Sequence, residues 1–239
     1  MSCILNIETS TSVCSVALSM DGEVLFAKAS FDGPSHAALL GVFVEEALSV
    51  LKKKGKKALD AVAVSSGPGS YTGLRIGVSV AKGLCFGFGI PLIGIHTLDI
   101  MAATVNSKGD SQIVSMTDNC LYCAMLDARR MEVYAAIYDA SLKPVRETKA
   151  DIVEVGTYAS YLEKGKVCFF GNGASKCKSV ITSPNAIFIE DIHPLAVNMI
   201  PLSEQAFAAG KFEDTAYFEP FYLKEFQATV AKNKVLLVR

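Results

Sequence analysis

The stretch SSGPGSYTGLRIG, residues 65–77, decides the fold, because glycines, a proline and hydroxyls lie between an apolar strand and a helix. The preceding LDAVAVSS, residues 59–66, alternates and then becomes apolar, which predicts a buried strand. The Gly-Pro-Gly segment predicts a sharp turn. Ser70 or Thr72 can cap the following helix, whose free amide groups could hold an anion. A purely structural turn fits the stretch equally well, and the Gly-Lys-Ser/Thr of a P-loop is absent.

Two acid-bearing turns suggest an internal duplication. Residues 3–31 predict strand, polar turn, strand, Asp21-Gly22 hairpin turn and strand. Glu8 stands beside hydroxyl residues in the first turn, a combination that normally faces a phosphate or its metal. CAMLDARRMEVYAAIYD, residues 123–139, repeats the pattern and places Asp127 where the first copy has Glu8. Two such halves facing each other would form a cleft.

Six blocks give the chain a specific resemblance. They are ILNIETSTSVCSVAL (4–18), PSHAALL (34–40), SSGPGSYTGLRIGVSVAKGL (65–84), PLIGIHTL (91–98), LDARRMEVYAAIY (126–138) and PFYLK (220–224). In this order they resemble the bacterial TsaB (YeaZ) family. The resemblance implies a two-lobed, duplicated ribonuclease H-like α/β fold of the actin, hexokinase and Hsp70 (ASKHA) class. The family's motif turn maps to Gly67, Pro68, Gly69, Ser70, Thr72, Gly73 and Arg75.

The family's role implies particular partners. It is the non-catalytic partner of TsaD in making threonylcarbamoyladenosine (t6A) at position 37 of tRNA. The resemblance therefore implies pairing with TsaD, a surface for the ATPase TsaE, contact with tRNA through the complex, and a homodimer when the chain is alone. We expect no firmly bound cofactor, although ATP or ADP could lodge at the complex interface.

The domain organisation follows the duplication. We predict an N-terminal lobe over 1–105, a C-terminal lobe over 106–210 and a C-terminal return segment over 211–239. The polar stretch NSKGDSQ, 106–112, marks the transition. A further turn, Gly171-Asn172-Gly173, falls where related folds hold an adenosine. A vestigial nucleotide cleft would then comprise Glu8, Thr9, Ser10, Asp127, Gly171 and Gly173.

Composition excludes several classes of protein. With 239 residues, 51% hydrophobic, the chain can bury a sizeable core. A net charge of −1 gives no overall electrostatic footprint for nucleic acid, so another subunit must hold most of a tRNA. Neither a secretory signal nor a membrane span is recognisable, so we expect a cytoplasmic protein.

The seven cysteines indicate reduced thiols. Only the pair Cys120 and Cys123 suggests a metal. A zinc site would need Cys168 and Cys177 as well, at an unfamiliar spacing, so ordinary strand residues are the favoured interpretation.

Two helices, at about 35–53 and 71–88, carry the argument for a partner. The first has apolar residues over half its circumference, and the second has a small-residue ridge at Gly73, Gly77 and Ala81. Both could be sandwiched inside the protein, but the resemblance favours pairing with TsaD or a second copy. On that reading a bulky residue at Gly77 would block pairing more than folding. The predicted interface comprises Leu39, Leu40, Phe43, Val44, Ala47, Gly73, Leu74, Gly77, Val78 and Ala81.

No catalytic constellation is evident, and we assign no catalytic or metal-binding residue. The three histidines, His36, His96 and His193, include no His-x-x-x-His pair. Glu8 also replaces the shorter aspartate usual at such a turn. Two enzyme alternatives of the same fold remain: an ATP-dependent phosphotransferase using Glu8 and Asp127, and a glycoprotease-like metallopeptidase, which the missing histidine pair disfavours.

Overall fold

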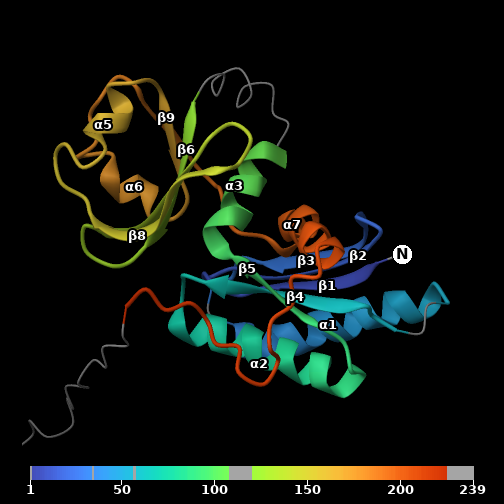
Figure 1. Cartoon of the computed structure of the whole chain (residues 1–239). Coiled ribbons are helices and arrows are strands. Elements are labelled where there is room, and N and C mark those ends of the chain that lie inside the picture. The colour runs from blue at the N-terminus through green and yellow to red at the C-terminus, as the bar shows by residue number, and fades with distance from the viewer. Residues whose placement is uncertain (1, 34, 56–57, 108–119, 225–239) are drawn as a thin grey trace, which may run out of the picture.

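The computed structural model describes residues 2–33, 35–55, 58–107 and 120–224 and contains two five-stranded sheets (Figure 1). The first sheet has the strand order β3-β2-β1-β4-β5, and the second has the order β10-β9-β6-β7-β8. Each central strand, β1 or β6, begins an antiparallel three-stranded meander on one side and pairs with parallel strands on the other. The predicted duplicated α/β fold is therefore confirmed.

Four strands of the first sheet are buried on both faces, as their largely apolar runs predict, whereas the edge strand β3 is mostly exposed. Its strands are β1 (Cys3–Glu8), β2 (Cys14–Met20), β3 (Glu23–Ser30), β4 (Ala61–Gly67) and β5 (Leu92–His96). Because successive side chains point to opposite faces, Leu5 and Ile7 pack toward α1 (His36–Lys53) and α2 (Tyr71–Phe88), whereas Ile4 packs on the other side. The helices α1 and α2 form one layer below this sheet (Figure 1).

The second sheet comprises β6 (Leu121–Asp127), β7 (Glu132–Tyr138), β8 (Pro144–Ile152), β9 (Val167–Phe170) and β10 (Ala186–Ile189). One face packs against the short helices α5 (Ala159–Leu162) and α6 (Ala174–Cys177), around Cys123, Met125 and Phe169. The other face packs against α3 (Thr97–Ser107), where Leu98 and Met101 contact the sheet at Ala124 and Phe170. The sheet is thus covered by a helix that precedes it in the chain.

The helix α7 (Ala196–Ala208) corrects the predicted domain boundaries. It lies within the predicted 106–210 lobe, yet it packs back on the first sheet, with Met199 against Ile4 and Ile93. In Figure 1, α3 lies between the two sheets, and α7 lies beside it on the upper face of the first sheet. The boundary at 105/106 therefore separates the sheets but not the helices that cover them, because each sheet takes a covering helix from the other half of the chain. The predicted transition at 106–112 falls largely outside the described residues.

Residues 211–224 form a segment, here called the C-terminal strap, that runs along the first sheet and reaches the second. Its Glu213 N–H donates to Leu92 C=O at 2.9 Å, along the free edge of β5. Its Phe221 N–H donates to Ser66 C=O at 2.6 Å. Lys224 then forms an ion pair with Glu132 at the start of β7. The strap is the described part of the predicted return segment 211–239.

The predicted helix boundaries hold closely. The α2 helix begins after Ser70, whose Oγ accepts the Gly73 N–H at 3.2 Å, and ends at Gly89 in a left-handed C-cap. Ser35 precedes α1 without a side-chain cap. Among the described residues, no helix is both long and apolar enough to cross a membrane.

Candidate functional site

The turn after β1 is closed from within. Glu8 is fully buried, and its Oε1 accepts the Ser10 N–H at 2.5 Å. The Thr9 N–H donates to Ser65 Oγ at 3.4 Å. Burial raises the pKa of the Glu8 carboxyl to about 7, although hydrogen bonds from Ser10, Ser65 and Thr9 favour its charged form. Two amides that a phosphate would need are thus committed to internal acceptors.

The start of α2 packs directly onto this turn. The Ser70 N–H donates to Ser10 C=O at 2.6 Å, and Thr9 Oγ1 donates to Gly73 C=O at 2.8 Å. A Cβ placed at Gly69, Gly73 or Gly77 would lie under 3.0 Å from Ser10 or Thr9. The glycines therefore allow the helix to approach the first turn of the same chain. This corrects the expectation that the ridge at Gly73 and Gly77 receives a partner helix.

The remaining residues of the motif turn fall into two groups. Gly67 and Pro68 are buried at the end of β4, whereas three residues around the start of α2 are exposed. Gly67 has φ +108°, and a Cβ there would lie 2.7 Å from Phe221 O of the strap; its peptide bond to Pro68 is cis. By contrast, Ser70, Thr72 and Arg75 are exposed. The turn therefore holds the strap on one side and the β1–β2 turn on the other.

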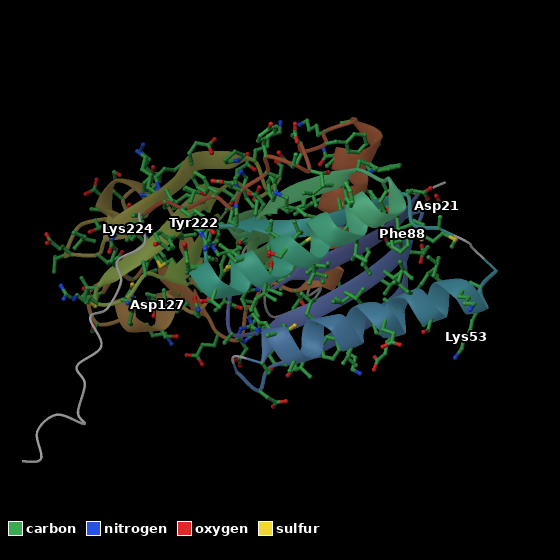
Figure 2. The ribbon with its side chains drawn as sticks, turned by 90° about the horizontal axis from the view of Figure 1, so that it is seen from below. Asp21, Lys53, Phe88, Asp127, Tyr222 and Lys224 are labelled. Atoms are coloured by element: carbon green, nitrogen blue, oxygen red, sulfur yellow. The ribbon has the colours of Figure 1, made fainter. Side chains whose placement is uncertain are left out.

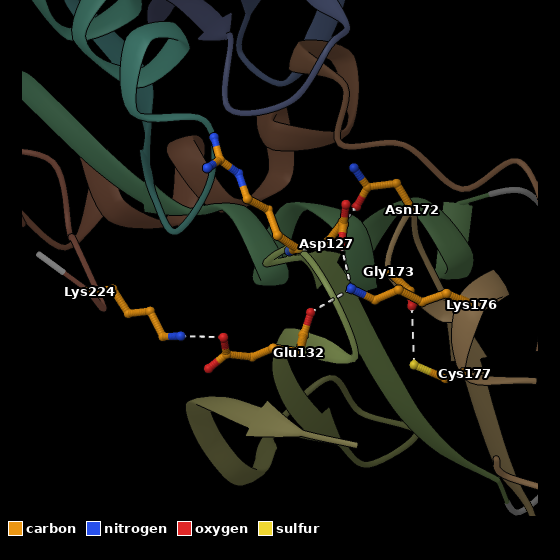
Figure 3. Close-up of polar contacts among 8 residues, drawn as sticks. Asp127, Glu132, Asn172, Gly173, Lys176, Cys177 and Lys224 are labelled. Carbon is orange, nitrogen blue, oxygen red and sulfur yellow. Dashed lines mark hydrogen bonds and ion pairs between the residues drawn. The ribbon is translucent and has the colours of Figure 1, made fainter. Parts of the chain in front are cut away.

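The second acid-bearing turn is neutralised by a lysine. Asp127 forms an ion pair with Lys176 of α6, and its N–H donates to Asn172 Oδ1 at 3.0 Å (Figure 3). Lys176 Nζ also donates to Glu132 C=O at 2.6 Å. Added Cβ atoms at Gly171 and Gly173 would clash with the main chain of β6. These glycines allow close packing on β6, which occupies the space beside them.

None of the predicted cleft residues lines the interlobe cavity. This cavity has a volume of about 380 Å³ and lies between β5, α3, α7, the β7–β8 hairpin and the strap. Tyr138 lines it and donates its hydroxyl to Asp99 Oδ1 at 2.6 Å. Burial raises the pKa of Tyr138. Tyr138 was missed in the sequence because it continues an apolar strand, and only the packing of α3 shows its polar partner.

The predicted partner-interface residues form the protein's own core. Leu40, Phe43, Val44, Ala47, Gly73, Leu74, Gly77, Val78 and Ala81 are all buried. Leu39 is half-buried and packs against the same core. The wide apolar arc of each helix is used against both the sheet and the neighbouring helix, since α1 and α2 lie side by side (Figure 2). Most of the interface assignment is therefore wrong.

A different set of small and apolar residues is exposed on the outer side of this helix layer, among exposed polar residues such as Glu45 and Ser79. On α1, Gly41 and Val42 are exposed, Val42 to 47%. On α2, Gly83, Phe86 and Gly87 are exposed, Phe86 to 87%. We call these five residues the outer α1/α2 face. In the sequence, this face could have been found from the apolar and small residues of each helix that lie outside its main buried apolar face.

The cysteines do not form a metal site in the described residues. Cys123 and Cys177 pack in one core of the second lobe, whereas Cys168, paired with Tyr122 in the β6–β9 ladder, points to the opposite face beside Cys120. No group of three metal-ligating His, Cys, Asp or Glu side chains occurs in 2–33, 35–55, 58–107 and 120–224. Burial raises the pKa of the Cys123 thiol, as expected for a strand residue.

Comparisons with known proteins agree with this geometry. Residues 32–232 match the family model for TsaD, tRNA N6-adenosine threonylcarbamoyltransferase. The tRNA threonylcarbamoyladenosine biosynthesis protein TsaB of Escherichia coli is 31% identical, with 92% of this chain and 94% of that protein covered. The YeaZ structure from Pseudomonas aeruginosa superposes with a TM-score of 0.75 at 26% identity, over 93% of this chain and 100% of that one.

A second Pseudomonas aeruginosa structure, described as similar to peptidase YeaZ, superposes with a TM-score of 0.78 at 26% identity and covers 94% of this chain and all of its own. The duplicated sheets and their acid-bearing turns define a two-lobed α/β protein of the ASKHA class. Within that class, the chain belongs to the TsaB (YeaZ) family.

Proposed function

We propose that this chain acts in t6A synthesis on tRNA as a non-catalytic subunit that pairs with TsaD. The names of its relatives support the pathway. The closed first turn supports the non-catalytic role, and it is the observation on which the proposal depends. A phosphate entering there would have to displace the Ser10 and Thr9 amides from Glu8 and Ser65 and push α2 away from the turn.

The outer α1/α2 face is the proposed pairing surface. Exposed small residues let another helix approach closely, and exposed Phe86 and Val42 provide apolar area that pairing would remove from water. The same face serves a homodimer when TsaD is absent. We further propose that TsaE binds the complex beside this pairing surface, and that ATP or ADP binds between the subunits rather than in this chain's first turn.

Co-purification with TsaD tests the pairing surface. Val42→Arg places a charge on the outer α1/α2 face, so we expect at least tenfold weaker capture of TsaD and a matching loss of t6A formation, with an unchanged melting temperature. Val155→Arg is the control, because Val155 is 89% exposed on the other lobe. Equal capture by both variants would place the partner elsewhere.

Calorimetry with ATP and magnesium on the isolated chain tests the non-catalytic role. We expect no binding heat and no hydrolysis. Turnover that disappears in Glu8→Ala would instead establish the phosphotransferase alternative.

A further inference from the structure

The β6–β7 turn places two arginines in a backbone conformation that arginine disfavours. Arg129 has φ +70° and Arg130 has φ +48°. The β2–β3 turn also has two successive residues with positive φ, but there they are Asp21 (+50°) and Gly22 (+82°), which suit such turns. A left-handed backbone costs free energy at any residue with a Cβ, most at residues without a short polar side chain. Turn stability alone therefore does not explain the arginines.

Backbone and Asp127 contacts hold the turn without help from the guanidinium groups. Ala128 N–H donates to Glu132 C=O at 3.0 Å, and Glu132 N–H donates to Arg129 C=O at 3.1 Å. Asp127 Oδ1 accepts the Arg129 N–H at 3.0 Å. Both arginine side chains are exposed, and neither forms an ion pair within the described parts of the chain. Their charges are thus available to an external anion.

Further cations from both lobes lie at the same end of the molecule. Lys224 of the strap is bound to Glu132. Burial raises the pKa of Tyr134, and the positive charges of Lys224 and Arg129 oppose that rise, so both cations lie near the Tyr134 hydroxyl. Two residues before Lys224, Tyr222 accepts a hydrogen bond from Arg75 Nε at 3.3 Å. Figure 2 shows Asp127, Tyr222 and Lys224 at one end of the protein and Asp21, Lys53 and Phe88 at the other.

The cations at this end differ in whether a carboxylate pairs with them. Asp127 forms an ion pair with Lys176, and Glu132 forms one with Lys224. The negative charge of Glu219 lies near Arg75 and attracts it electrostatically. Arg129 and Arg130 are therefore the two cations of this set that have no carboxylate partner in the described parts of the chain. We call the cations Arg75, Arg129, Arg130, Lys176 and Lys224 the cationic strip.

We propose that the cationic strip binds the phosphate backbone of the tRNA, with Arg129 and Arg130 as its principal contacts. Guanidinium groups bind phosphate oxygens through two parallel hydrogen bonds, and two unpaired arginines on a tight turn present such donors together. The strip is small, which suits a subunit that supplements a larger RNA surface on its partner. The inference deepens the proposed function and rests on it for the identity of the RNA.

The salt dependence of binding tests the strip. An unmodified tRNA transcript that reads a codon beginning with A is titrated with the complex of this chain and TsaD, and separately with the chain alone. Arg129→Gly combined with Arg130→Gly removes both charges and suits the left-handed backbone, so folding should be retained or improved. We expect the slope of log K against log salt to fall by about 1.4 to 1.8, which corresponds to two lost phosphate contacts.

Two matched variants separate charge from backbone effects. Arg129→Lys with Arg130→Lys keeps the charge and the disfavoured backbone, and it should retain the parental slope. Lys52→Ser with Lys53→Ser removes two charges at the far end of α1 and should leave the slope unchanged. A parental slope in the glycine variant, or an equal loss in the Lys52/Lys53 control, would overturn the inference. So would competition by ATP for the same arginines, which would indicate a small-anion site.

TsaD capture by the same samples keeps the two proposals apart. If TsaD is captured while tRNA affinity is independent of the arginines, only the cationic strip is refuted. If the chain captures no TsaD but its own tRNA binding depends on the arginines, the pairing proposal fails and the strip stands.

Discussion

Glu8 makes the stability of the protein depend on pH in an unusual direction. Its pKa is raised from 4.5 to about 7 in the folded state by burial, so the folded protein holds this proton more tightly than the unfolded chain. Stability should therefore fall as pH rises from about 4.5 to 7 and level off above that, with a total effect on the order of 3 kcal/mol.

Urea unfolding of parent and Glu8→Gln across pH 5 to 8 measures this contribution. The glutamine can still accept the Ser10 N–H but carries no charge. The free energy of unfolding of Glu8→Gln, relative to that of the parent, should therefore increase with pH and then become constant. A difference between the two proteins that does not vary with pH would show that Glu8 titrates normally.

Glycines on the two sides of α2 should respond oppositely to alanine. A Cβ at Gly77 would clash with Thr9 Oγ1, which is bonded to Gly73, so Gly77→Ala should lower the free energy of unfolding by about 1 to 3 kcal/mol. Gly83 is exposed, and no atom lies within 4 Å of a Cβ added there, so Gly83→Ala should raise the free energy of unfolding by up to about 1 kcal/mol. Denaturant midpoints, with unchanged m-values, measure the change in the free energy of unfolding for both variants. Equal changes in the two variants would contradict the packing of Gly77 against Thr9.

At the scale of the element, the α1/α2 layer should govern self-association. With Phe86 and Val42 exposed on one face, we expect the isolated chain to dimerise there and bury about 1,200 to 2,000 Å² in total. Phe86→Ser should shift the mass measured by light scattering toward the monomer, and Phe88→Ser, beyond the face at the last residue of α2, is the matched control. A parental dimer in the Phe86 variant would place self-association on another surface.

The helices also show how far sequence reasoning extends. The bounds of α1 and α2, the Ser70 cap and the positions of Glu8 and Asp127 could all be predicted, because capping, periodicity and repeated turns are local signals. The partners of the apolar arc could not. Whether Leu40 or Gly77 faces a sheet, a neighbouring helix or another protein depends on residues dozens of positions away, such as Thr9, and periodicity reports only that a face is apolar.

At the scale of the whole molecule, the two lobes should unfold together, because each sheet is covered by a helix from the other half of the chain. The first sheet needs α7 from the second half, the second sheet needs α3 from the first, and the strap joins both. We expect one calorimetric transition whose van't Hoff enthalpy equals the measured enthalpy. Two resolved transitions would show that the lobes are independent, as the predicted boundary at 105/106 would allow.

The return of α7 to the first sheet also has a consequence during synthesis on the ribosome. All five strands of that sheet have been made once His96 is added, but the helix that covers Ile4, Ala63 and Ile93 ends only at Ala208. At typical bacterial and eukaryotic elongation rates the interval is roughly 6 to 22 s. For that time the nascent chain exposes an apolar sheet face that its own later residues will cover, which makes it a substrate for the chaperones that bind emerging chains.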